Sequence, residues 1–197
     1  MEFKIVPCNR VQIYLLFYKP KLDDPWLNRL VATFDGPFCH VEMAFSDKWG
    51  DQPWEKELMG SSIYQGETVF FKPKTYARDG YFSIALEVTL PQMYKIKAYC
   101  KQEQDNKVAF NRNAMFAAYL PFYQFINTND TFCSKHVTAA LLYGGVAEVR
   151  DLNPSLMTPS KLYKLLSSQT VQVVVPSKMF AKDARSKCTA MMVRDLL

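Results

Sequence analysis

The feature that most constrains the fold is a strongly patterned helix that begins at a cysteine. Residues 132–143 (F-C-S-K-H-V-T-A-A-L-L-Y) place apolar side chains at helical spacing, and Gly144-Gly145 ends the segment as glycine commonly ends a helix. The preceding polar residues 127–130 predict a turn. Cys133 falls in the first turn, on the face that Val137 continues, so its sulfur should point toward the core.

The rest of the chain predicts interleaved strands and helices, which makes the fold class α+β. Expected strands are residues 11–18, 39–45, 61–71 and 82–90, the last two being separated by Lys72-Pro73 and Arg78-Asp79-Gly80, and a last strand at 170–175. Expected helices are residues 26–34 (begun by an aspartate cap at Asp23-Asp24-Pro25 and ended by Gly36-Pro37), 91–100, 111–126 with an interruption near Pro121, and a short helix from Thr158-Pro159-Ser160. We expect one domain over residues 1–176, followed by a basic tail at 177–197.

Length and composition fit one globular domain without a disulfide scaffold. The chain has 197 residues, 49% of them hydrophobic and 22% charged, which is enough for a single stable core. Its apolar stretches are far shorter than the roughly 20 residues that cross a membrane, and we expect no secretory signal. The five cysteines are odd in number and widely spaced, which favours a reducing compartment. Neither a metal site nor a cofactor is predicted.

The net charge of +5 lies entirely in the last part of the chain. Residues 161–197 hold seven basic and two acidic side chains, whereas residues 1–160 are balanced. Such a segment is most simply a solvated end, but it could also touch a membrane surface or an acidic partner. No specific nucleic-acid contact is predicted.

Cys133 is the best candidate for a nucleophile. A thiol at a helix N-terminus lies among backbone N–H groups that have no partner within the helix, and these favour the thiolate form. The same N–H groups can bind the oxyanion of an acyl intermediate. The alternative is that Cys133 only packs in the core, as many free cysteines do.

A thiolate nucleophile needs a base, and the chain has two histidines. His40 begins a strand after a Gly-Pro turn, where a histidine is exposed enough to titrate and rigid enough to aim. His136 lies three residues after Cys133 on the same helix and is the alternative base. Glu42 shares a strand face with His40 and could orient it, while Ser61 and Ser62 on the next expected strand are other candidates.

These residues resemble the circularly permuted branch of the NlpC-type papain-like hydrolases. That branch includes bacterial cell-wall-type amidases, relatives of lecithin:retinol acyltransferase and poxvirus proteins. The resemblance covers about residues 11–166 and rests on F-C-S-x-x-V-x-x-A-L-x-x-x-G-V at 132–146, H-V-E-M-A-F at 40–45 and T-P-S-K-L-Y-K-L-L at 158–166. In this branch the cysteine follows the histidine, as it does here. The resemblance implies a permuted papain-like fold, with an antiparallel sheet packed on the helix that carries the cysteine.

Carried over by position, the resemblance makes Cys133 the nucleophile and His40 the base. The family's third polar residue falls near Ser61 or Ser62, where serine departs from the expected carboxylate, amide or histidine. Glu42 stands where the family often has glycine and could have taken the orienting role.

The sequence therefore predicts a thiol hydrolase that transfers acyl groups from an amide, peptide or isopeptide bond. A lipid acyl hydrolase or acyltransferase is the close alternative, since residues 115–125 (M-F-A-A-Y-L-P-F-Y-Q-F) could line an acyl-chain pocket, although they could equally be core. The third possibility is a catalytically decayed module that binds a partner through its basic tail. The cysteine pattern and the expected lack of export favour the cytoplasm, or the host cytoplasm for a viral protein.

Overall fold

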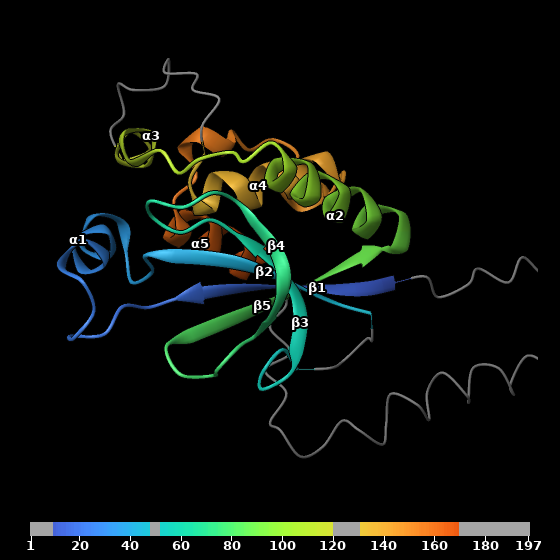
Figure 1. The fold of residues 1–197 in the computed structure, drawn as a ribbon, viewed down its shortest axis with the longest axis horizontal. Coiled ribbons are helices and arrows are strands. Elements are labelled where there is room, and N and C mark those ends of the chain that lie inside the picture. Colours follow the sequence, from blue (N-terminus) through green and yellow to red (C-terminus); the bar gives the residue numbers. More distant parts are fainter. Residues whose placement is uncertain (1–9, 48–51, 120–130, 170–197) are drawn as a thin grey trace, which may run out of the picture.

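The fold is α+β and is built on a five-stranded antiparallel sheet (Figure 1). The computed structural model describes residues 10–47, 52–119 and 131–169. Along the sheet the order is β4-β3-β2-β1-β5. The strands are β1 (Arg10–Tyr18), β2 (His40–Ser46), β3 (Glu57–Ser62), β4 (Phe70–Thr75) and β5 (Tyr81–Thr89).

The interior strand β1 is apolar because both of its faces are covered. It pairs with β2 on one side and with β5 on the other, and residues 12–17 are buried. Leu15 lies opposite Met43 of β2 and Ile84 of β5, so one face of three strands presents a continuous apolar surface. This surface is the base on which the helices pack.

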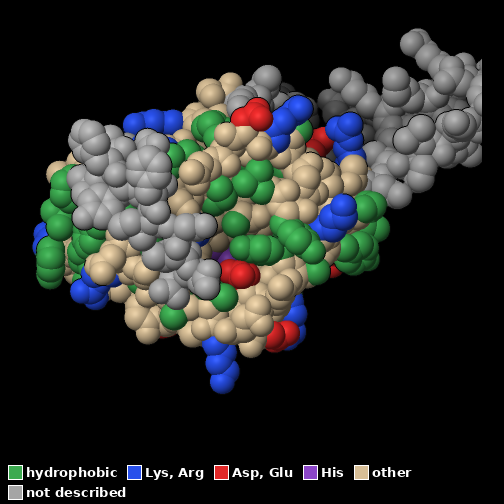
Figure 2. Space-filling model, turned by 90° about the horizontal axis from the view of Figure 1, so that it is seen from above, with side chains coloured by type: hydrophobic (Ala, Val, Ile, Leu, Met, Phe, Trp, Pro, Cys, Tyr) green, Lys and Arg blue, Asp and Glu red, His purple; other side chains and the backbone are tan. Residues whose placement is uncertain are grey.

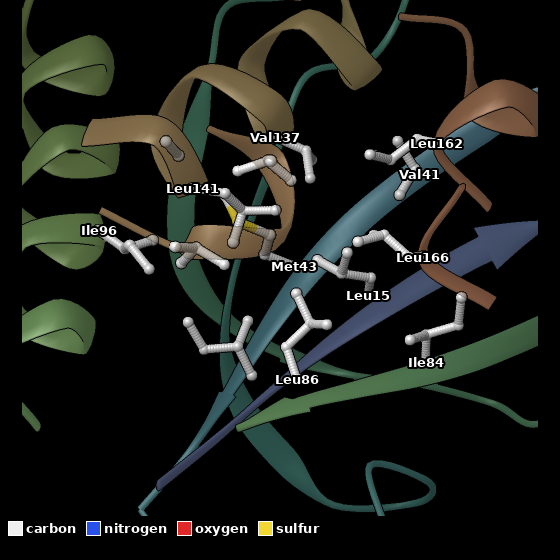
Figure 3. Close-up of a cluster of buried hydrophobic side chains, with 14 of the residues drawn as sticks. Leu15, Val41, Met43, Ile84, Leu86, Ile96, Val137, Leu141, Leu162 and Leu166 are labelled. Carbon is white, nitrogen blue, oxygen red and sulfur yellow. The ribbon is translucent and has the colours of Figure 1, made fainter. Parts of the chain in front are cut away.

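Helices cover that apolar face of the sheet (Figure 1). The helices that do so are α2 (Leu90–Asp105), α4 (Cys133–Tyr143) and α5 (Pro159–Gln169). Helices α1 (Trp26–Asp35) and α3 (Arg112–Ala117) contribute to a second, smaller apolar cluster, and two short 3-10 turns are η1 (Ala147–Val149) and η2 (Pro154–Leu156). Val137 and Leu141 of α4 point toward Met43, and Ile96 of α2 flanks them (Figure 3). The largest apolar core thus fixes α4 against β2.

The start of α2 and both ends of α4 agree with the sequence prediction, whereas α2 continues to Asp105, beyond the expected end at Cys100. Thr89 and Gln92 form a reciprocal capping box at the start of α2. Helix α4 begins after Phe132, which offers no side-chain cap, and it ends at Gly144, with Gly145 at a φ of 73°. The start of α4 therefore has backbone amides that no capping side chain occupies.

The prediction of one strand over 61–71 is wrong, because these residues span a turn between two strands. β3 ends at Ser62, and the chain reverses through Gly66, whose φ of 80° suits glycine. The expected break at Lys72-Pro73 is also wrong, since both residues lie inside β4. Proline is tolerated there because β4 is an edge strand.

Two helix predictions need correction. The first residue before α1 is Pro25, without a side-chain cap, because the Asp24 carboxylate instead accepts from the Lys21 amide and the Tyr18 hydroxyl. Only α3 represents the helix expected at 111–126 within the described residues. The predicted turn at 127–130, the strand at 170–175 and the tail at 177–197 lie outside the described residues.

Within residues 10–47, 52–119 and 131–169, no helix has the length and apolar character needed to cross a membrane.

Candidate active site

Cys133 lies at the junction between the start of α4 and the sheet. Its side chain belongs to the main apolar core and is only 4% exposed. The first hydrogen bond of the helix runs from the His136 amide to the Phe132 carbonyl, so the amides of Cys133 and Ser134 precede it. Ser134 anchors this end because its hydroxyl donates to the Met157 carbonyl at 2.7 Å. The helix start that carries the sulfur is thus firmly held.

His40, the first residue of β2, faces Cys133 across the junction. The imidazole and the sulfur are in hydrogen-bonding contact. Burial alone would lower the pKa of His40, but the charge and hydrogen bond of Cys133, together with Glu42, outweigh it and raise the pKa to about 9. The His40 side chain is 14% exposed, and a histidine is visible at the surface in the view from above (Figure 2). The geometry therefore favours an imidazolium next to the sulfur.

Glu42 lies on the other side of the His40 ring. Its Oε1 is 3.4 Å from His40 Nε2, an ion-pair distance, and Nε2 makes no well-aligned hydrogen bond within the described residues. Burial would raise the pKa of Glu42, but His40 and then Lys74 lower it to about 2. Glu42 is therefore a buried carboxylate that stays charged.

Three donors hold this carboxylate: Lys74 of β4, Tyr81 of β5 and Tyr64 of the loop between β3 and β4. Oε1 accepts from the Tyr64 hydroxyl at 2.8 Å, the Tyr81 hydroxyl at 2.9 Å and Lys74 Nζ at 2.9 Å, while Oε2 accepts from Lys74 at 2.7 Å. Tyr64 also stacks on the His40 ring, with centroids 4.9 Å apart and planes at 23°. None of the three donors is among the site residues predicted from the sequence. They come from three separate segments of the chain, so no spacing in the sequence marks them as one group.

Ser61 and Ser62, which the sequence predicts near His40, do not contact His40. Ser62 Oγ donates to the Val41 carbonyl at 2.7 Å, and Ser61 Oγ donates to the Phe70 carbonyl at 2.9 Å. Both are fully buried and tie β3 to its neighbours. The structure therefore brings together Cys133, His40 and Glu42, and it leaves Ser61 and Ser62 outside this group.

His136 points away from the candidate site and into the core. Its Nε2 lies 2.9 Å from Ser61 Oγ, and its Nδ1 is buried without a partner among the described residues. Burial lowers the pKa of His136 to about 4. The structure therefore pairs the His136 ring with Ser61.

A narrow apolar cleft reaches Cys133 between α1, α3 and α4. It encloses about 190 Å³ between atoms and is too tight as it stands for a water-sized group. Its walls are mostly apolar: Val31, Cys39, Met115, Tyr119, Phe132, Cys133, Ser134, Thr158 and Pro159 line it. Of the aromatic stretch 115–125, Met115 and Tyr119 face this cleft, while residues 120–125 lie outside the described part.

Two other thiols lie among the described residues: Cys39 lines the same cleft as Cys133, and Cys100 belongs to the main apolar core. Burial raises the pKa of Cys39 and of Cys100 to about 12 in each case. All three are free thiols. In residues 10–47, 52–119 and 131–169, no group of three or more histidine, cysteine or acidic side chains is placed to hold a metal ion.

Comparison of the chain with protein-family models, with curated proteins and with solved structures finds no match in any of the three.

Proposed function

We propose that this protein is a thiol hydrolase in which Cys133 and His40 transfer an acyl group. The observation that carries the proposal is the contact of the His40 imidazole with a sulfur at the start of a helix. A charged imidazolium next to a thiolate is the resting state of a cysteine nucleophile. Glu42 supports the proposal, since a fixed carboxylate behind the ring favours its protonated form.

The proposed reaction follows from the placement of these groups. The Cys133 thiolate attacks a carbonyl carbon, and the Cys133 backbone N–H donates to the oxyanion that forms. The imidazolium of His40 then protonates the leaving group as the tetrahedral intermediate collapses to a thioester. Water, deprotonated by the now neutral His40, attacks the thioester and releases the acid and the Cys133 thiolate, which leaves the proton on His40 and restores the ion pair; another acceptor could replace water.

An amide, peptide or isopeptide bond is the substrate class that we propose first. The leaving group of such a bond is an amine, which must be protonated before it departs. A histidine whose pKa is raised to about 9 keeps its proton at neutral pH and is suited to that step. We further propose that the fold is the permuted papain-like one, supported by the α+β class and by a histidine strand that precedes the cysteine helix.

A lipid acyl ester is the second candidate, and the apolar cleft beside Cys133 is the observation that favours it. Met115 and Tyr119 place apolar surface next to the sulfur, where the acyl part of a substrate would lie. Because the cleft is narrow, a long chain would require its walls to part. Turnover of amide and lipid-ester substrates of equal acyl length would separate the two candidates.

We also propose a cytoplasmic location, in the host cytoplasm for a viral protein. The free thiols Cys39, Cys100 and Cys133 support a reducing compartment. In the same proposal the excess positive charge of residues 161–197 contacts a membrane surface or an acidic partner. Partner binding that falls steeply with salt would support this contact.

Alkylation of the folded protein tests the catalytic proposal. Wild type, His40→Ala and His136→Ala are treated with iodoacetamide from pH 5 to 9, and the modified cysteines are mapped by mass spectrometry. We expect selective modification of Cys133 that persists at pH 6 and is lost in His40→Ala, with His136→Ala as the matched histidine control. A Cys133 no more reactive than Cys39 and Cys100 would refute the hydrolase and favour the catalytically decayed binding module.

A further inference from the structure

Lys74 shares the Glu42 carboxylate with His40, which gives the buried acid two cationic neighbours. Lys74 Nζ lies 2.9 Å from Oε1 and 2.7 Å from Oε2, whereas His40 Nε2 lies 3.4 Å from Oε1. Lysine is therefore the closer partner and contacts both oxygens. The imidazole takes the longer approach to an oxygen that already accepts three hydrogen bonds.

We propose that Lys74 is a positioning residue that sets the upper pH limit of the Cys133–His40 pair by drawing the Glu42 carboxylate partly away from His40. This inference rests on the proposed function, and it adds to it a residue that touches neither substrate nor sulfur. Without Lys74, His40 would be the one cationic partner of Glu42 among the described residues, and the imidazole would hold its proton to higher pH.

Neutral donors complete the surroundings of the carboxylate. Tyr64 and Tyr81 donate to Oε1, and Tyr76 also faces the same carboxylate. Burial raises the pKa of each of these tyrosines well above its ordinary value, so they remain uncharged donors. The titratable groups that face Glu42 are thus His40 of β2, Lys74 of β4, Tyr64 before β4, Tyr76 after it, and Tyr81 of β5.

The cation on Lys74 is close enough to act on His40. Lys74 Nζ is 2.9 Å and His40 Nε2 is 3.4 Å from the same atom, Glu42 Oε1, so the two nitrogens are within roughly 6 Å of each other. In the effective dielectric of a protein site, the repulsion between two unit charges at this separation lowers the pKa of His40 by about one to two pH units. Removing the charge should therefore raise the titration midpoint of His40 by about that amount.

Lys74 also holds the ring that covers His40. Its ammonium contacts the Tyr64 hydroxyl and lies 5.1 Å from the centre of the Tyr64 ring. Since Tyr64 stacks on His40, the lysine supports the orientation of the imidazole as well as its proton affinity. Arginine would keep the charge, and methionine or glutamine would remove it while keeping most of the side-chain volume.

The test is an NMR titration of the two histidine rings in the full chain from pH 5 to 12, with His136→Gln used to assign the signals. The variants are Lys74→Met, Lys74→Gln and Lys74→Arg. Lys72→Met is the matched control, because Lys72 lies on the same strand and does not contact Glu42. We expect the His40 midpoint to rise by about one to two pH units in Lys74→Met and Lys74→Gln, and to stay near wild type in Lys74→Arg and Lys72→Met.

A His40 midpoint in both neutral Lys74 variants that equals the Lys72→Met value, or lies below it, overturns the inference. Iodoacetamide labelling of Cys133 in the same samples separates this failure from failure of the proposed function. Unshifted midpoints with normal, His40-dependent labelling refute the role of Lys74 alone. Labelling that does not depend on His40 refutes the Cys133–His40 pair, whatever the titration shows.

Discussion

The buried ring of His136 should make the fold sensitive to acid, and the size of the effect follows from its surroundings. Ser61 Oγ uses its proton on the Phe70 carbonyl, so it accepts from His136 Nε2–H. Nδ1 then carries a lone pair, and protonating it would place a charge in the core without a partner. Burial accordingly lowers the pKa of His136 from 6.5 to about 4.

The sign of the effect is set by this lowered pKa. As the pH falls below 6.5, His136 binds a proton in the unfolded chain, whereas in the folded protein it stays neutral until about pH 4. The effect of His136 on the free energy of unfolding is close to zero at pH 7. Keeping this ring neutral in the folded protein lowers the free energy of unfolding by about 2 kcal/mol at pH 5 and by about 3 kcal/mol below pH 4.

His136→Gln measures this cost, because the amide of glutamine can still donate to Ser61 and does not titrate. Urea unfolding of both proteins at pH 7 and pH 5 gives two stability differences. The stability of His136→Gln relative to wild type at pH 7 serves as the reference. Between pH 7 and pH 5 we expect the free energy of unfolding of the variant, relative to that of wild type, to increase by about 2 kcal/mol. The carboxylates and His40 are common to both chains, so they cancel. A difference that is the same at both pH values would refute the reasoning.

Three further substitutions test other parts of the account. Glu42→Gln removes the negative charge that faces His40, so the NMR midpoint of His40 should fall by about one to two pH units, opposite in sign to Lys74→Met. Gly60→Ala would place a Cβ 2.0 Å from the Tyr76 hydroxyl, and the displaced ring should cost about 1–3 kcal/mol in urea unfolding. Thr89→Ala breaks the capping box of α2 and should cost about 1 kcal/mol without changing Cys133 alkylation.

The fold could be predicted from sequence where one local pattern decides the element. The apolar run of β1 and the glycine end of α4 are examples, and both agree with the structure. The prediction failed at residues 61–71, because β-rich composition continues through a turn and only Gly66 marks the reversal. The strand position of Pro73 likewise depends on β4 being at an edge, which is a property of the whole sheet.

Some residues of the candidate site can be predicted from the sequence, and others cannot. Cys133, His40 and Glu42 can be selected locally, from a helix start and from a shared strand face. Tyr64, Lys74 and Tyr81 meet at Glu42 only after three segments have paired, so no local spacing selects them. Its place on the next expected strand and the family position both predict Ser61 near His40, but the sheet turns its hydroxyl toward the core and His136.

The most direct measurement is the intact mass of the protein during reaction with an activated acyl ester such as p-nitrophenyl acetate. The account predicts one acyl group per chain, mapped to Cys133 and removed by neutral hydroxylamine, as a thioester requires. Acylation should be absent in Cys133→Ala, slower by about 100-fold in His40→Ala, and near wild type in His136→Gln. Acyl groups spread over several side chains, or acylation of Cys133 that is undiminished in His40→Ala, would contradict the central claim that these two residues form a nucleophilic pair.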